Sequence, residues 1–249
     1  MKRRPYALIG PLLLIALWSL ASFARLIDPF FLPDPFTTTG VLLRLVGQGV
    51  ILPDVWATLV RVFLAFGIAV VIGLPLGLLL GRAERAYRSL EFLIDFFRST
   101  PATALFPMFL LLFGVSDTSK ISVAAFSSAL IIVFNTAYGV IHGKKSRTFA
   151  ARLMGASQWQ IFRHIAFWES LPQTVIGLRN AVSLSLVVVV VTEMFIGTNA
   201  GLGRRIIDAQ ITYDIAEMYA VILLTGIIGY AFNALFVAVE GRMLHWSGQ

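Results

Sequence analysis

The chain has 249 residues, of which 58% are hydrophobic and only 13% are charged, whereas about 25% of the residues of a typical soluble domain are charged. This composition excludes a soluble globular protein and indicates a polytopic membrane protein. The formal net charge of +7 does not indicate a nucleic-acid-binding protein, because the basic residues lie scattered at the ends of apolar runs rather than on one contiguous face. The chain contains no cysteine, which excludes disulfides, thiolate catalysis and cysteine-ligated metals.

The first apolar run, residues 6–24, follows three basic residues at positions 2–4 and is long enough to cross a hydrocarbon layer of about 30 Å. Small residues at positions 22 and 24 are typical of a signal-peptide cleavage site, but we expect the run to be retained as a membrane span. Residues 28–53 are richer in Pro, Asp and Thr and predict an external connection. We expect one short amphipathic helix in it, near residues 41–46.

Residues 56–81 predict the second span. Its Gly73, Gly77 and Gly81 are spaced four residues apart, which places them on one helix face and favours close contact with another helix. Such faces pack within one chain more often than between chains, so we expect an intrachain contact. Pro75 lies in the same turn and should bend the helix.

An arginine-rich turn at residues 82–88 precedes the third predicted span, residues 90–115. Asp95 and Arg98 lie three residues apart near its start, on one helical face where they can form an ion pair. Residues 121–141 predict the fourth span, which returns the chain to the side on which the third began.

A polar stretch of thirty residues, 143–172, follows the fourth span. Within it, Ser157 and Gln160 have the spacing of a capping box and predict a helix that begins at Ser157. Gly155 comes just before and offers a cheap positive φ, so we expect two short helices joined at the glycine. The stretch is amphipathic, and it is too short and too charged to span a bilayer. From the pattern alone, it could also be a helix on the lipid headgroups.

Residues 174–196 and 217–239 predict the last two spans, for six crossings in one transmembrane domain, residues 1–249. Twelve of the 20 Lys and Arg residues lie on the side of residues 143–172, and five lie on the other side. Because positive charge is concentrated in cytoplasmic loops, this bias places both termini and the polar stretch in the cytoplasm.

Enzymatic motifs are missing from the sequence. Residues 139–146 approach the P-loop pattern, but the glycine register is wrong and no strand precedes them. The histidines, at 142, 164 and 245, have no carboxylate at metal-binding spacing. The G-x-S-x-G motif of serine hydrolases is also absent. We therefore expect no catalytic residue, no metal and no cofactor in this chain.

Polar side chains within the apolar spans are costly, at about 2.5–3.5 kcal/mol for a charge at the helix centre. One interpretation is structural pairing, for instance Asp95 with Arg98, or Arg179 with an acidic residue of another span. The other is that they line a path for a polar or anionic solute, with the arginines near the cytoplasmic side and Glu193 near an outer gate. The path candidates are Arg98, Asn135, Thr136, Arg179, Asn180 and Glu193.

The polar stretch resembles the cytoplasmic EAA loop of ATP-binding-cassette (ABC) importer permeases. The matching residues, in order, are Ala150, Ala151, Gly155, Ile165, Leu171 and Pro172. Two positions differ, because Phe149 stands where the family often has glutamate and Trp168 where many members have the first proline. The resemblance implies that the loop docks on an ATPase through Ala150, Ala151, Leu153, Met154, Gly155, Ala156, Ser157, Gln158, Trp159 and Phe162.

Other segments are similar to permeases of the nitrate, sulfonate and taurine group. They are residues 57–82, 98–120, 134–140, 151–157, 171–181 and 192–206. The resemblance implies an all-α, MetI-like type I importer fold with six transmembrane helices and cytoplasmic termini, in the bacterial inner membrane. The implied partners are a second permease copy, two ATPase subunits that carry the ATP and Mg, and a periplasmic solute-binding protein.

The leading hypothesis is therefore a permease subunit that imports a small polar or anionic solute by alternating access, driven by a separate ATPase. An ion-coupled secondary transporter is the main alternative, although we see no internal repeat of the kind found in many such transporters. An intramembrane enzyme is a third, which the absence of a recognisable catalytic pair disfavours. The sequence does not distinguish sulfonates, nitrate, bicarbonate or heterocycles as the solute.

Overall fold

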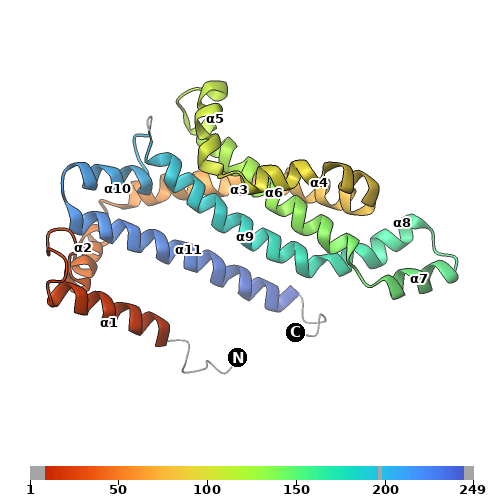
Figure 1. Ribbon diagram of the computed structural model, residues 1–249, viewed down its shortest axis with the longest axis horizontal. Coiled ribbons are helices and arrows are strands. Elements are labelled where there is room, and N and C mark those ends of the chain that lie inside the picture. The colour runs from red at the N-terminus through yellow and green to blue at the C-terminus, as the bar shows by residue number, and fades with distance from the viewer. Residues whose placement is uncertain (1–8, 196–197, 244–249) are drawn as a thin grey trace.

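The computed structural model describes residues 9–195 and 198–243, and this part of the chain is helical without any β-strand. The helices form an elongated bundle (Figure 1). In chain order they are α1 (Ile9–Phe23), α2 (Pro35–Gly47), α3 (Leu52–Arg82), α4 (Glu84–Ser99), η2 (Ala102–Leu105), α5 (Phe106–Phe113), α6 (Asp117–Ile141), α7 (Lys145–Leu153), α8 (Gln158–Ile161), η3 (Phe162–Ala166), α9 (Phe167–Glu193), α10 (Leu202–Ile211) and α11 (Ile215–Met243).

Four helical segments of the described residues are long and apolar enough to cross a membrane: α3, α6, residues 158–193 and α11. The bent pair of α4 with residues 102–113 makes a fifth if it is a single span. Helix α1 is apolar but has 15 residues, fewer than the roughly 20 that a perpendicular crossing needs. The predicted start of this span, Tyr6, lies outside the described residues, as do His245, the basic residues 2–4 and the predicted end of the fifth span, Ile196. Six crossings therefore stay a prediction.

The third predicted span is not one straight helix. It bends by 92° between α4 and residues 102–113, so a single crossing over residues 90–115 stays a prediction. The cause is local, because Pro101 has no N–H and forces the preceding Thr100 out of the helical region. Thr100 has φ −75° and ψ 126°. In Figure 1, α5 projects sideways from the bundle after this bend.

The glycine face of α3 packs on α6 of the same chain, which confirms the predicted intrachain contact. A Cβ atom added at Gly73, Gly77 or Gly81 would lie 3.0, 2.7 or 2.6 Å from side-chain atoms of α6. Only glycine therefore allows the two helices to approach this closely.

Helices α6 and α9 are among those that extend beyond the spans predicted from the sequence. Helix α6 begins at Asp117 rather than at residue 121. Helix α9 begins at Phe167 and passes through Pro172, and it continues α8 through the π-helical turn η3. The end of the polar loop is therefore already part of a long helix, which was not expected from Leu171 and Pro172.

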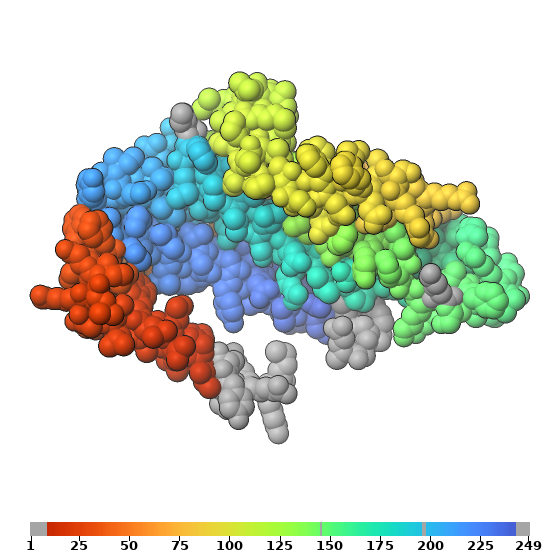
Figure 2. Space-filling model, viewed as in Figure 1, coloured from red at the N-terminus to blue at the C-terminus, as the bar shows by residue number. Residues whose placement is uncertain are grey.

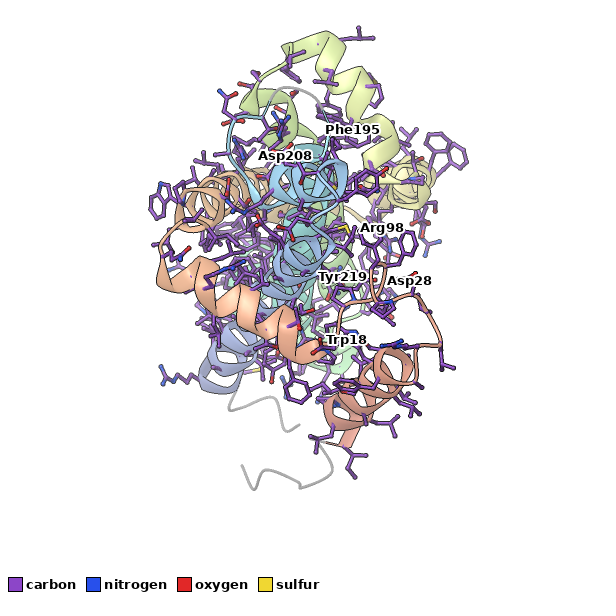
Figure 3. All side chains as sticks on the ribbon, turned by 90° about the vertical axis from the view of Figure 1, so that its left-hand side faces the viewer. Trp18, Asp28, Arg98, Phe195, Asp208 and Tyr219 are labelled. Atoms are coloured by element: carbon purple, nitrogen blue, oxygen red, sulfur yellow. The ribbon has the colours of Figure 1, made fainter. Side chains whose placement is uncertain are left out.

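The predicted short helix of the external connection is α2, which contains residues 41–46. Asp34 caps it by accepting hydrogen bonds from the backbone N–H groups of Phe36 and Thr37, both at 2.9 Å. The hydroxyl of Thr37 and these N–H groups lower the pKa of the Asp34 carboxyl below its usual value. Figure 3 shows Trp18 of α1 beside Tyr219 of α11, and the two rings stack with centroids 6.1 Å apart.

Candidate functional site

Helices α7 and α8 form an exposed loop that projects from one end of the bundle (Figure 2). The turn between them is built on Gly155, which has a φ of +80°. The Gly155 N–H donates to the Arg152 carbonyl oxygen and the Ala156 N–H to that of Ala151, both at 3.0 Å. This pair of bonds is the Schellman arrangement that ends a helix at a glycine. The predicted joint between two short helices is confirmed.

The capping box at the start of α8 is also confirmed. The Gln160 N–H donates to the Ser157 hydroxyl at 3.3 Å, and the Ser157 N–H donates to the Gln160 side-chain oxygen at 2.8 Å. Two N–H groups without helical partners are thereby satisfied. The direction of α8 relative to α7 is therefore fixed by the chain itself.

The ten predicted docking residues lie together on this loop, and all but three of them are exposed. Leu153 and Met154 are 74% and 87% exposed and Trp159 is 56% exposed, while Ala151, Ala156 and Phe162 are half-buried. A hollow of about 350 Å³ lies beside them, lined by Ala151, Met154, Gly155, Ala156, Gln160, Ile161, His164 and Ile165. The loop therefore presents large apolar side chains around a depression at its glycine joint.

Arg82, at the end of α3, ties this loop to the bundle. Its guanidinium carbon lies 5.9 Å from the ring centroid of Trp159 and 5.7 Å from that of Phe162, within the range of cation–π attraction. No local pattern in the sequence indicates this contact, because Arg82 lies in an arginine-rich turn that is far along the chain from Trp159.

Glu169, in the first turn of α9, makes the second tie. It pairs with Arg147 of α7 at 3.0 Å and accepts a hydrogen bond from the Lys144 N–H. Its side chain is 11% exposed. A cleft of about 660 Å³ lies between the end of α3, α7 and α8, with Arg82 and Glu169 in its wall. Glu169 was not among the predicted docking residues. It follows Trp168, the position at which many members of the family have proline.

The opposite end of the bundle holds an ionic cluster that is buried except for the side chain of Asp117, which is 55% exposed. The Arg61 guanidinium of α3 bonds to the Glu193 carboxylate of α9 at 2.7 Å and to Asp117 of α6 at 2.9 Å. Thr58 donates to the same Glu193 carboxylate at 2.9 Å. The Glu193 side chain is fully buried, and that of Arg61 is 8% exposed. Four polar groups from three helices thus close this end.

The same cluster holds the first turn of α10. The Gly203 N–H donates to Glu193 at 3.0 Å, and the Leu202 N–H donates to the Thr58 hydroxyl at 2.9 Å. A Cβ atom at Gly203 would overlap the carbonyl oxygen of Val190, so glycine is required there. Further along α10, Arg205 pairs with Asp54 at 3.0 Å and with Glu217 at 2.7 Å.

The pairing interpretation is confirmed for three of the six path candidates, one of which is Glu193 with its partner Arg61. Arg98 pairs with Asp95 at 2.9 Å, and Arg179 pairs with Glu240 of α11 at 3.4 Å. In addition, the Arg98 guanidinium lies 3.7 Å from the centroid of the Phe134 ring.

The other candidates lie in different surroundings, so the structure does not bring the six into one cavity. Asn135 is almost fully buried and accepts a hydrogen bond from Gln173 at 3.0 Å. Thr136 is fully buried, and its hydroxyl has no hydrogen-bond partner. Asn180 is exposed.

A bundle of long apolar helices with an exposed helical loop at one end defines the class of transporter permeases. The fold resembles that of a subunit of the methionine ABC transporter MetNI, solved in inward-facing conformations. Two such structures give TM-scores of 0.66 and 0.67 at 23% sequence identity, and they cover 76% and 78% of this chain and 94% and 96% of theirs.

Residues 73–245 match the family model of the binding-protein-dependent transport system inner membrane component, and the chain belongs to this family. A probable ABC transporter permease of Brucella melitensis is 30% identical, covering 86% of this chain and 87% of its own. The taurine transport system permease protein TauC of Escherichia coli is 28% identical over 97% and 90% of the two chains. The nitrate import permease NrtB of Synechocystis is 30% identical over 77% and 69%. The chain is thus an ABC transporter permease subunit and a multi-pass membrane protein.

Proposed function

We propose that two copies of this chain form the membrane channel of an importer for a small polar or anionic solute of the taurine, sulfonate or nitrate kind. A binding protein delivers the solute at the periplasmic face, and two cytoplasmic ATPases drive its passage by alternating access. This chain carries no catalytic group, because ATP and Mg belong to the ATPase. The membrane is the bacterial inner membrane, with both termini in the cytoplasm.

The observation that carries this proposal is the exposed α7–α8 loop. A surface that combines Leu153, Met154 and Trp159 with a hollow beside Gly155 is suited to fit a protein partner, since large exposed apolar groups mark such contacts. The ten residues from Ala150 to Phe162 given above are the proposed docking surface.

The geometry also supports a way in which a movement of the ATPase is transmitted to the membrane helices. Helix α8 runs through η3 into α9 without a break, so a displacement of α8 by the ATPase moves α9 with it. Arg82 transmits the same displacement to α3. Because α3, α6 and α9 pack closely together, they are expected to move as one rigid body.

Substitution at Gly155 tests the proposal. Gly155→Val forces a β-branched residue into a positive φ, which is strained by about 1–2 kcal/mol, although a Cβ atom there meets no neighbour within 4 Å. We expect normal membrane insertion but loss of ATPase co-purification and of solute-stimulated ATP hydrolysis. Gly155→Asn is the matched control, because asparagine tolerates this conformation. This variant should retain most of the ATPase co-purification and most of the solute-stimulated hydrolysis.

The alternative class makes the opposite prediction. If Gly155→Val couples normally, the proposed docking surface is wrong. If uptake into ATP-free vesicles runs on an ion gradient, the chain works as a secondary transporter.

A further inference from the structure

The bend between α4 and η2 lies at the middle of the membrane-spanning bundle. Phe97 contacts Phe126 with ring centroids 5.5 Å apart, and Phe126 lies near the middle of α6. Arg98 lies over Phe134 of the same helix. The bend therefore has the depth of the hydrocarbon layer rather than that of the headgroups.

At this depth the surface of the chain carries exposed charge. The side chains of Asp95 and Arg98 are 54% and 33% exposed, although they pair at 2.9 Å. Ionisable groups within membrane spans face the interior of a bundle or a water-filled cavity rather than lipid. This face of α4 is therefore not a lipid-facing surface.

The backbone at the bend is a second, independent indication that this face does not contact lipid. The helical ladder is interrupted at Thr100 and Pro101, and Ser99 and Pro101 are exposed. Non-helical backbone at membrane depth is tolerated only inside protein or along a water-filled cavity. A hollow of about 490 Å³ lies at this point, lined by Phe92, Asp95, Phe96, Ser99, Thr100 and Pro101.

We infer that this bend lines the aqueous passage for the solute and that Arg98 contacts the anionic group of the solute within it. A guanidinium offers a planar pair of donors that fits a sulfonate or another small oxyanion. Asp95 is the counter-ion that holds Arg98 while the passage is empty, and the anion takes its place. The inference rests on the proposed function, and it selects Arg98 from the six path candidates as the residue that determines specificity for anions.

The absence of cysteine from the chain permits a direct test in membrane vesicles that contain the whole transporter. Ser99→Cys places a thiol at the bend. Val71→Cys is the matched control, because Val71 is 73% exposed and lies within the apolar run of α3. Both are treated with two methanethiosulfonate reagents, one carrying a sulfonate and the other a trimethylammonium group.

We expect the cysteine at 99 to react about 100-fold faster than the one at 71, since thiolates and charged reagents are both excluded from lipid. The sulfonate reagent should react faster than the ammonium reagent at 99. Arg98→Gln should reduce this preference by about tenfold, as expected for the loss of a focusing charge, whereas Arg98→Lys should keep it and Asp95→Asn should increase it.

Equal, slow rates at both positions would show that lipid or protein covers the bend and would overturn the inference. The inference would also be overturned if the Arg98→Gln variant still co-purified with the ATPase and kept the full preference for the sulfonate reagent at position 99. ATP-driven transport by the unsubstituted chain is measured in parallel, so that a failure at the bend is distinguished from a failure of the proposed function.

Discussion

Single glycines set the distance between the two central helices. Gly77 of α3 faces α6, where an added Cβ atom would lie 2.7 Å from the Thr136 Cβ atom and 3.0 Å from the Val133 carbonyl oxygen. Gly67 lies on the same helix, but a Cβ atom there would meet nothing within 4 Å. The same residue type therefore has opposite roles ten positions apart.

Alanine substitution should separate these roles. Gly77→Ala forces α3 and α6 apart, and overpacking of this kind destabilises by about 1–3 kcal/mol. Gly67→Ala removes only backbone freedom and should stabilise its helix by up to about 1 kcal/mol. Thermal unfolding in detergent, followed by tryptophan fluorescence, should show a lower Tm for the first variant and an equal or higher Tm for the second. A matching decrease in both would contradict the packing described for Gly77.

At the scale of the elements, the α7–α8 loop is held from two directions. Glu169 joins α7 to α9, and Arg82 reaches Trp159 and Phe162 from the end of α3. These two sets of contacts connect the exposed loop with α9 and α3, which both pack on α6. A displacement of the loop is therefore shared between α3 and α9.

Removing the tie to α3 should reduce coupling without preventing docking. Arg82→Ala is expected to keep ATPase binding and basal hydrolysis but to lower the solute transported per ATP several-fold, because cation–π contacts of about 0.5–2 kcal/mol are lost. Arg82→Lys should restore part of the ratio. Arg85, an exposed residue three positions later, provides the control, and Arg85→Ala should leave the ratio unchanged. An unaltered ratio in Arg82→Ala would mean that α9 alone carries the motion.

The elements differ in how far the sequence could predict them. The capping box at Ser157, the joint at Gly155 and the glycine face of α3 depend on residues within one or two turns of each other, and all three were predicted. The 92° bend was not, since a proline signals a break while the angle depends on packing against α6. The pairing of Arg61 with Glu193 joins positions that are 132 residues apart, and no local pattern indicates which charges meet at that distance.

At the scale of the whole molecule, the two ends of the bundle are built differently. One end carries the exposed α7–α8 loop (Figure 1). At the other, the ionic cluster around Glu193 holds the first turn of α10. The proposed function needs this asymmetry, because the ATPase would act on the loop and the far end would have to respond to that displacement as a unit. The orientation of the bundle in the membrane then decides which compartment supplies the energy.

Orientation can be measured with two single cysteines, because the natural chain has none. Ser157→Cys lies at the docking loop and Asn199→Cys before α10, and both positions are exposed. The excess of Lys and Arg near the loop predicts that Ser157 faces the cytoplasm. An impermeant thiol reagent should therefore label position 157 only in inside-out vesicles and position 199 only in right-side-out ones. Added ATPase should protect the first and not the second, since only the loop is its proposed docking surface. If the labelling were reversed, the loop would face a compartment without ATP, and no cytoplasmic ATPase could drive this permease through it.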